Sequence, residues 1–140
     1  NFLPLGGLPK VTENVAAGGN GFELLCPFFC FPGEWDDYEG LARFMFSSYI
    51  TVPVYANFFT WLGYGDEIAE MRSLWEQKDR AGAAAAAPRE LIEDTFLIGP
   101  PEKIRERLDA YVAGGITLPV ITPITTPDKM EETIRALAPR

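Results

Sequence analysis

A nearly continuous apolar run lies near the start of the chain. Residues 22–31 (FELLCPFFCF) are rich in aromatic side chains and are bounded by Gly21 and Pro32. A short apolar run between turn residues is typical of a strand buried on both faces of a sheet. Pro27 has no backbone N–H to donate to a ladder, so we expect the regular strand either to stop near Cys26 or to bulge there.

Two shorter apolar runs, residues 95–98 and 118–122, predict two more strands, and we expect all three strands to be buried on both faces of the sheet. Each is followed by apolar residues at helical spacing, such as Ile104 and Leu108 after the first run and Ile134 after the second. Strands that alternate with helices over such short linkers form parallel sheets with right-handed crossovers. The pattern therefore predicts an α/β fold.

The long segment between the first and second predicted strands is expected to be helical. The alanine run 83–87 has the highest helix propensity available, and we interpret it as a helix or spacer. Another helix is expected ahead of the first strand, from Pro9. In the long segment, helices are expected to start near Asp36, Thr51, Asp66 and Pro88.

The three predicted strands make an incomplete sheet. Three parallel strands leave two unpaired edges, and apolar edges invite association with other strands. A whole (β/α)8 barrel needs about 250 residues, and this chain has 140. We therefore expect partner strands on sequence outside these residues. A small three-stranded domain that protects its own edges is the alternative.

The chain is acidic, which limits its partners. It has 12 basic and 20 acidic residues and a net charge of −8. DNA, RNA and anionic lipid surfaces are bound through basic patches, so none of them is expected as the main partner. No run approaches the roughly 20 apolar residues that cross a membrane, and the first residues do not read as a secretory signal. We expect a cytoplasmic protein.

The cysteine and histidine content limits the chemistry. Cys26 and Cys30 are four residues apart, and in a strand their Cα atoms would be about 13 Å apart. A disulfide tolerates only about 4.4–6.8 Å, so we expect two buried free thiols. The chain has no histidine, which excludes Ser-His-Asp and Cys-His catalysis by these residues and leaves no metal site to predict.

Three segments carry a resemblance to a known family, and the strongest is residues 97–116 (LIGPPEKIRERLDAYVAGGI) followed by LPVITP. This segment resembles the luciferase-like monooxygenase superfamily, most closely its bacterial F420-dependent branch. That family typically shows a Gly-x-Pro-Glu turn, a helix ending in Arg-Leu-x-x-Tyr-x-x-Ala-Gly, and a strand. Residues 42–61 contain YITVPVY, which is similar to a Tyr-x-x-x-Pro-x-Tyr sequence in the helical insertion, and residues 132–139 resemble a common ending.

The resemblance implies a position within a larger fold. Residues 1–140 would be the C-terminal portion of one luciferase-like TIM barrel, holding strands six to eight of the (β/α)8 fold, with a helical insertion at about residues 36–94. Strands one to five would lie upstream. In the family these carry much of the cofactor pocket and the usual catalytic histidine or acid. No catalytic residue is therefore assigned here, and the isolated chain is expected to be inactive.

The resemblance also implies a function and partners. The intact protein would be an oxidoreductase or monooxygenase that moves a hydride, or activates oxygen, through F420 or FMN on a small organic substrate. Relatives often form homodimers, so the expected protein partner is a second copy or the missing N-terminal half of the barrel. The alternative is a non-catalytic flavoprotein relative, or an α/β assembly module that pairs through its exposed sheet edge.

Candidate site residues lie where barrel strands end, because barrel active sites are built from loops at the carboxyl ends of the strands. By the family register, Asn1 and Phe2 would lie beside the cofactor ring; the alternative is a frayed terminus. Phe31, Glu34 and Trp35 would wall the substrate pocket, with ordinary core packing as the alternative for the aromatic residues.

The turn at Gly99 has two interpretations. A glycine before a helix suggests a phosphate held at the helix N-terminus. Pro100 and Pro101 lack backbone N–H groups, however, so two of the donors that an anion needs are missing. We favour a structural turn with proline at the start of the helix.

Overall fold

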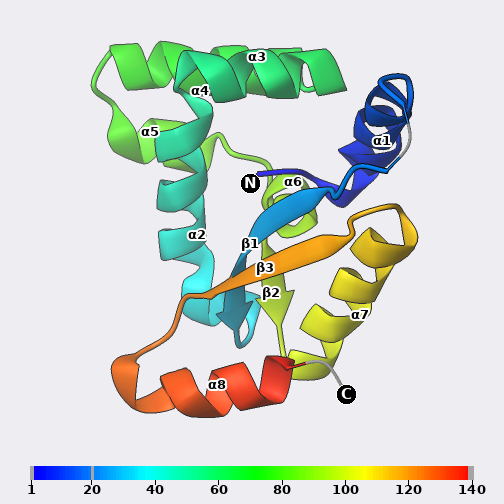
Figure 1. Cartoon of the computed structure of the whole chain (residues 1–140). Coiled ribbons are helices and arrows are strands. Elements are labelled where there is room, and N and C mark those ends of the chain that lie inside the picture. Colours follow the sequence, from blue (N-terminus) through cyan, green and yellow to red (C-terminus); the bar gives the residue numbers. More distant parts are fainter. Residues whose placement is uncertain (1, 20, 139–140) are drawn as a thin grey trace. The chain divides into compact units, whose positions relative to one another are not determined.

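The computed structural model describes residues 2–19 and 21–138. It divides into a sheet unit, formed by residues up to Tyr38 and from Asp94 onward, and a helical unit, Glu39–Glu93. The elements in chain order are η1 (Leu5–Gly7), α1 (Leu8–Ala16), β1 (Leu25–Pro32), α2 (Trp35–Ile50), α3 (Pro53–Leu62), α4 (Gly65–Glu76), α5 (Arg80–Ala85), α6 (Arg89–Thr95), β2 (Leu97–Gly99), α7 (Pro101–Ala113), β3 (Leu118–Pro123), η2 (Pro127–Lys129) and α8 (Met130–Leu137) (Figure 1).

The predicted α/β pattern is confirmed for these elements. All three strands are parallel, and α7 joins β2 to β3 as the expected crossover. The proline-led helix starts also agree, since Pro9, Pro53 and Pro101 each occupy the first or second position of a helix. The first backbone N–H groups of a helix have no acceptor within the helix. Proline suits these positions because its missing N–H costs no hydrogen bond there.

Pro27 does not interrupt β1, which corrects our expectation of a stop or a bulge. The strand runs to Pro32, and its register with β3 is unbroken from Leu25 opposite Leu118 to Cys30 opposite Pro123. β2 pairs with Cys30–Pro32 and not with Pro27, so among the described residues the strand paired with Pro27 is β3 alone. Proline is tolerated in such an edge-like setting.

The order of the strands differs from that of three consecutive barrel strands. Such strands would pair in chain order and place β2 in the centre, whereas the observed order is β2-β1-β3. The length of the strands gives a physical reason. β3 forms six residue pairs with β1, while β2 has only three residues to offer a neighbour.

β3 is not buried on both faces, which corrects a second expectation. Its residues alternate between exposed and half-buried, with Leu118 45 % and Val120 39 % exposed. Leu25, which pairs with Leu118, is 53 % exposed. We call the side of the sheet that carries these three residues the open face. Burial on both faces needs a second covering layer, and in the described part of the sheet unit these three side chains stay partly exposed.

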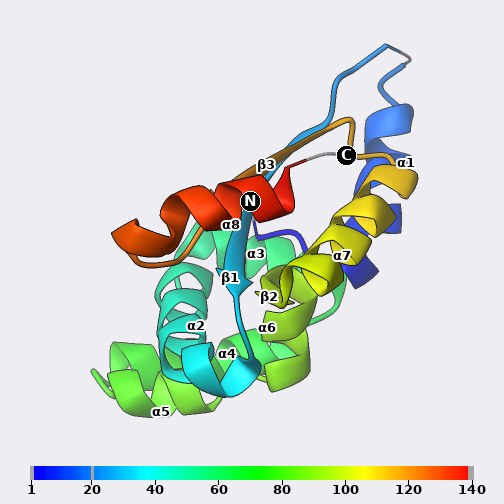
Figure 2. The same cartoon turned by 90° about the horizontal axis from the view of Figure 1, so that it is seen from below.

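The opposite side of the sheet is covered by helices. Phe28 packs its ring on that of Tyr111 in α7, with 4.4 Å between the ring centroids. α7 contacts all three strands, and α8 packs on α7 and β3 (Figure 2). Cys26 and Cys30 alternate with the open-face residues of β1 and are buried on this helix-covered side.

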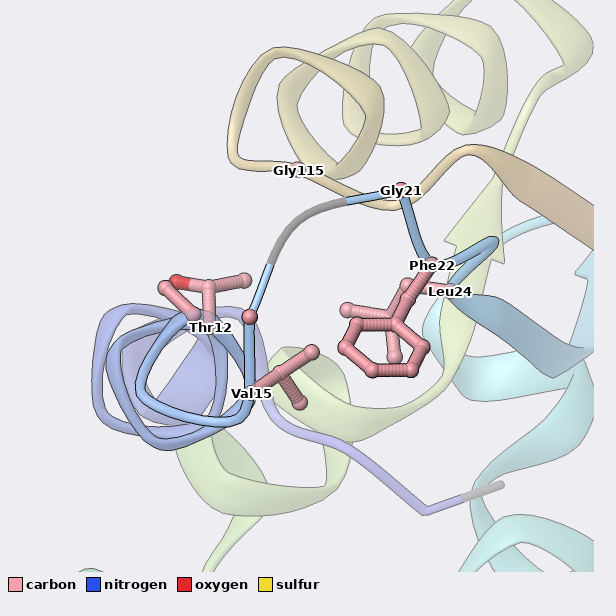
Figure 3. A pocket seen from close by; sticks show the side chains of 8 residues that line it. Thr12, Val15, Gly21, Phe22, Leu24 and Gly115 are labelled. Carbon is pink, nitrogen blue, oxygen red and sulfur yellow. The ribbon is translucent and has the colours of Figure 1, made fainter.

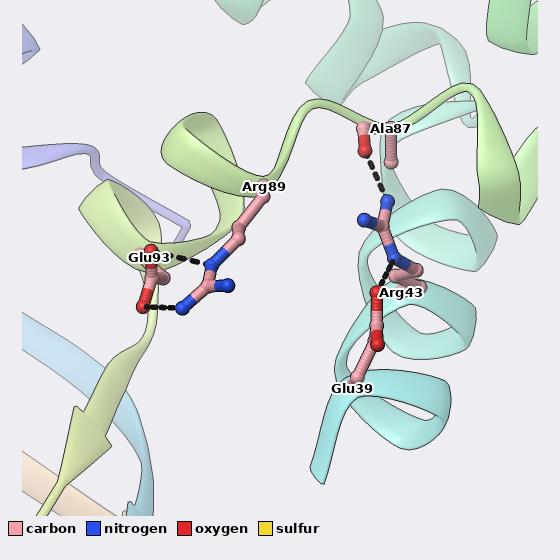
Figure 4. A network of polar contacts seen from close by, with 5 residues as sticks. All are labelled: Glu39, Arg43, Ala87, Arg89 and Glu93. Atoms are coloured by element: carbon pink, nitrogen blue, oxygen red, sulfur yellow. Dashed lines mark hydrogen bonds and ion pairs between the residues drawn. The ribbon is translucent and has the colours of Figure 1, made fainter. Parts of the chain in front are cut away.

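The helical unit is held together by apolar packing and a few polar links. Asp79 caps α5 by accepting a hydrogen bond from the backbone N–H of Gly82 at 2.8 Å. Arg43 on α2 pairs with Glu39 at 2.8 Å and donates to the carbonyl of Ala87 (Figure 4).

Among the described residues, no helix is long and apolar enough to span a membrane.

Candidate functional site

An aromatic cluster lies on the carboxyl half of β1. We use that name for Phe2, Phe29, Phe31 and Phe96. The ring of Phe96 lies 5.4 Å from Phe2, 5.9 Å from Phe29 and 5.4 Å from Phe31, measured between centroids. Several of these pairs are edge-to-face, which is a favourable arrangement for aromatic rings. The cluster joins two strands to the N-terminal segment.

Strand alternation explains how the cluster forms. Phe29 and Phe31 are two apart in β1 and therefore point to the same face of the sheet. Phe31 pairs with Ile98 in β2, so Phe96, two residues earlier, lies on that face as well. This is also the face that carries Leu25, Leu118 and Val120. At the Phe31 end of β1, the aromatic rings cover it.

Phe2 enters the cluster with an unusual backbone. Its φ of 60° is in the left-handed region, which is strained for a bulky side chain. Its side chain is only 3 % exposed. Such strain persists where surrounding contacts hold it, and it recurs at ligand sites. Phe2 thus packs on the rings of Phe29 and Phe96, and its place beside a cofactor remains a prediction. Asn1, the other predicted cofactor residue, lies outside the described residues.

The loops that follow the strands meet at the same end of the sheet. The backbone N–H of Gly33 donates to the carbonyl of Gly99 at 3.1 Å. The backbone N–H of Ile124 donates to the carbonyl of Cys30 at 2.7 Å. A Cβ on Gly33 would lie 2.9 Å from the ring of Tyr38, and one on Gly99 would lie 2.6 Å from Lys103. The phenol and the lysine therefore lie against these two loops. Neither was selected from the sequence, because only the fold brings them to the strand ends.

The predicted substrate residues separate into two environments. Phe31 is fully buried in the aromatic cluster and Trp35 is 6 % exposed. Glu34 is exposed, and its backbone N–H donates to the carboxylate of Asp37 at 3.3 Å. The structure therefore brings Phe31 together with Phe2 and leaves Glu34 at the solvent boundary. Their role in substrate binding remains a prediction.

The geometry of the Gly99 turn supports a structural role. Gly99 has a φ of +148°, and the carbonyl of Pro100 accepts the first helical hydrogen bond from Ile104 at 3.1 Å. Pro100 and Pro101 leave the helix start short of N–H donors. α7 thus begins as a proline-led helix rather than as an anion cradle.

A polar network fastens the N-terminal segment, and sequence reasoning missed it. The hydroxyl of buried Tyr111 donates to the carbonyl of Leu3 at 2.7 Å. Asp94 accepts from the backbone N–H of Gly6 at 2.8 Å and pairs with Arg107 at 3.3 Å. Burial raises the pKa of Tyr111 well above its usual value. This network lies next to Phe2 in sequence and holds it at the sheet.

Two cavities of the sheet unit lie away from the aromatic cluster. One, of about 610 Å³, is bounded by α7, β3 and α8. The other, of about 200 Å³, lies at the amino ends of β1 and β3, where the side chains of Val15 and Phe22 face the same hollow (Figure 3). In parallel α/β proteins ligands bind at the carboxyl ends of strands, so neither cavity is our candidate site.

The two cysteines are free and buried, as predicted. Cys30 is fully buried, and its thiol lies 3.8 Å from the carbonyl of Phe28. Desolvation raises the pKa of Cys30 to about 12 and raises the pKa of Cys26 as well. Both groups therefore stay protonated at neutral pH, which suits packing and not nucleophilic chemistry.

This burial predicts an alkaline loss of stability. A thiol whose pKa is raised by folding stabilises the protein fully below its unfolded pKa of 9.0, and that contribution is lost as pH rises toward about 12. Between pH 9 and 10 we expect the free energy of unfolding to fall by about 1 kcal/mol because of Cys30. Urea unfolding at each pH measures it. Cys30→Ala should show a shallower decline, and equal slopes in the two proteins would contradict the assignment.

The fold and site together define a class of protein. Parallel strands with helical crossovers and a ring-lined strand end describe an α/β protein whose ligand site is expected at the carboxyl edge of the sheet. A family model described as Luciferase-like monooxygenase matches residues 8–118. The chain therefore belongs to the luciferase-like monooxygenase family. No curated protein and no solved structure gave a significant match.

Family membership supports a general kind of function and confirms the resemblance seen in the sequence. The match covers the Tyr-x-x-x-Pro-x-Tyr segment and the helix before β3, two of the three segments that carried the resemblance. Luciferase-like proteins are oxidoreductases or monooxygenases that act on small molecules, generally with a flavin or F420. The particular cofactor and substrate belong to the proposal that follows.

Proposed function

We propose that this chain is the C-terminal part of an oxidoreductase that uses FMN or F420 on a small, fairly apolar organic molecule. The observation that carries the proposal is the aromatic cluster on the carboxyl half of β1, next to the loops that follow the strands, in a chain of this family. Flat heteroaromatic rings pack well against aromatic side chains. This end of the sheet is also where α/β proteins bind their ligands.

We also propose that the sheet belongs to a (β/α)8 barrel in the intact protein. Two features support this. α7 covers one face, as the outer helices of a barrel do, and the open face is apolar at Leu25, Leu118 and Val120, as a barrel interior is. A barrel in chain order requires β3 beside β2. The proposal therefore includes a move of β3 from the edge of β1 to the edge of β2 when the other strands are present.

The residues of this chain fit the ring system of such a cofactor better than its phosphate group. The aromatic cluster suits the apolar ring system, and Phe2 and Phe31 would orient it and exclude water. For a phosphate group, the N-terminus of α7 lacks donors at its two prolines, and Lys103 beside Gly99 supplies a cation instead. When bound, FMN or F420 supplies the hydride or oxygen chemistry. We assign no catalytic residue to this chain.

The substrate would lie on the solvent side of the cluster. Phe31 and Trp35 are buried and would form an apolar wall, while Glu34 is exposed and would meet a polar group of the substrate. An apolar wall with few polar contacts is typical of sites for small organic molecules.

The proposal predicts cofactor binding by the intact gene product and no turnover by the 140-residue chain alone. Fluorescence titrations with FMN and with F420 measure binding, and hydride transfer or oxygen consumption measures turnover. Lys103→Ala should weaken binding about tenfold, because a charged contact contributes roughly 1.4 kcal/mol. Lys10→Ala, on α1, is the matched control and should leave binding unchanged. If the intact protein bound neither cofactor, the alternative of a non-catalytic assembly module would replace this proposal.

A further inference from the structure

The larger cavity of the sheet unit, between α7, β3 and α8, lies on the helix-covered side of the sheet. It has a volume of about 610 Å³, and its apolar wall includes Leu108 and Val112 of α7, Ile121 of β3 and Leu137 of α8. Ile121 pairs with Phe28, whose ring packs on α7, so the two side chains share that side of the sheet. We call this space the α7–α8 cavity. The aromatic cluster lies on the opposite face.

The α7–α8 cavity has the size of a small-molecule site. Folded interiors are closely packed and hold few voids larger than a water molecule. Ligand sites are hollows of roughly 300–1,000 Å³ with mainly apolar walls and a few polar groups. Leu137 is 3 % exposed, whereas Val112 is 48 % exposed. The cavity therefore reaches from a buried apolar wall to solvent beside Val112, where a ligand can enter.

Two side chains of opposite charge also line the cavity, Arg105 and Asp109. They are four residues apart in α7, which places their Cβ atoms about 5–6 Å apart on one side of the helix. The guanidinium of Arg105 donates to the carbonyl of Ala136 in α8, which uses one of its five N–H groups. Among the ion pairs of the described residues, none joins Arg105 to Asp109. Both charges can therefore face a ligand.

We propose that the α7–α8 cavity binds an α-amino acid with a large apolar side chain. Arg105 would hold the carboxylate, because a guanidinium matches the two carboxylate oxygens. Asp109 would accept hydrogen bonds from the ammonium group, and the side chain would fill the space along Leu108, Ile121 and Leu137. The site involves no flavin or F420, so it does not depend on the function proposed above.

The pair of charges selects this class of ligand over simpler amphipathic molecules. A fatty acid has a carboxylate for Arg105 but meets the like charge of Asp109. An apolar amine suits Asp109 but meets the like charge of Arg105. Repulsive groups of this kind exclude the wrong ligand as effectively as attractive groups bind the right one. Only a molecule with both charges beside an apolar body satisfies the whole cavity.

Isothermal titration calorimetry of the full chain with L-tryptophan tests the proposal. We expect a dissociation constant of about 0.1–1 mM, which is typical of a ligand of this size with two charged contacts. Indole-3-propionate lacks the ammonium group and tryptamine lacks the carboxylate, so each should bind about tenfold more weakly. L-alanine should also bind about tenfold more weakly, because it leaves the apolar wall unfilled.

Two variants assign the charged contacts. Asp109→Asn should weaken L-tryptophan binding about tenfold and tighten indole-3-propionate binding about threefold, because the repulsive carboxylate is gone. Arg105→Gln should weaken L-tryptophan binding similarly and tighten tryptamine binding. A general loosening of the fold cannot produce this exchange of preference. Glu106→Gln is the matched control, because it removes one exposed carboxylate of α7 that does not line the cavity. It should bind like wild type.

Four results would overturn the proposal. The first is no binding of L-tryptophan by the wild-type chain at concentrations on the order of 5 mM. The second is equal affinity for L-tryptophan and indole-3-propionate. The third is an Asp109→Asn protein that binds all ligands like wild type; this variant stays informative even if Arg105→Gln loses its contact with Ala136 and unfolds. The fourth is loss of binding in the intact gene product, which would show that the rest of the protein fills the cavity.

Discussion

Replacing Phe96 with alanine is expected to lower the free energy of unfolding by about 3–5 kcal/mol. Phe96 is 1 % exposed, and its ring contacts those of Phe2, Phe29 and Phe31. Truncation would leave a cavity at the centre of the aromatic cluster, where both strands and the N-terminal segment meet. The loss is a large part of the stability of a small domain, which is typically 5–15 kcal/mol.

Urea unfolding of Phe96→Ala measures this loss, and two controls support the interpretation. Phe96→Leu keeps most of the apolar volume and should cost under about 2 kcal/mol. Phe44→Ala removes a ring that is 54 % exposed on α2 and should change stability by no more than about 0.5 kcal/mol. If Phe44→Ala and Phe96→Ala had equal effects, the cluster would not be the centre of the fold that we describe.

Replacing Tyr111 with phenylalanine is expected to cost about 1–3 kcal/mol, although only one oxygen is removed. The ring would still pack on Phe28 at 4.4 Å. The buried carbonyl of Leu3 would lose its donor, and an unsatisfied buried acceptor carries a full desolvation penalty. Because Leu3 adjoins Phe2, we expect the N-terminal segment to loosen, with faster amide hydrogen exchange at Gly6.

The pH dependence of Tyr111→Phe provides an independent check. Burial raises the pKa of Tyr111, so its protonated form stabilises the fold fully below the unfolded pKa near 10, and this contribution declines at higher pH. Wild type should therefore lose more stability above pH 10 than Tyr111→Phe does. Identical alkaline profiles would show that the hydroxyl is not buried in the way described.

Part of the aromatic cluster could be predicted from the sequence. The apolar run around Phe31 and the short run before Gly99 predicted two strands, and strand alternation alone predicts that Phe29 and Phe31 share a face. Phe2 was selected from the family register. That Phe96 lies at the centre of the cluster could not be predicted, because it depends on the register between β1 and β2, which local periodicity does not contain.

The polar contacts were less predictable. Tyr111 and Asp94 are separated along the chain, and only the packing of α7 on the sheet brings the phenol to the carbonyl of Leu3. Lys103 was not selected from the sequence, and its place over Gly99 follows from a close approach that glycine permits. Side-chain contacts of this kind depend on tertiary packing, which the sequence pattern does not specify.

The sequence by itself determined the alternation of strands and helices, the proline-led helix starts and the buried thiols, because each depends on residues close along the chain. Tertiary structure alone decided the order β2-β1-β3 and the uninterrupted path of β1 through Pro27. It also decided that Leu118 and Val120 stay partly exposed on the open face. The physical reason is that strand pairing and burial depend on which distant segment is available as a neighbour. An apolar run predicts that a segment is buried. Only the folded structure shows which other segments pack against it.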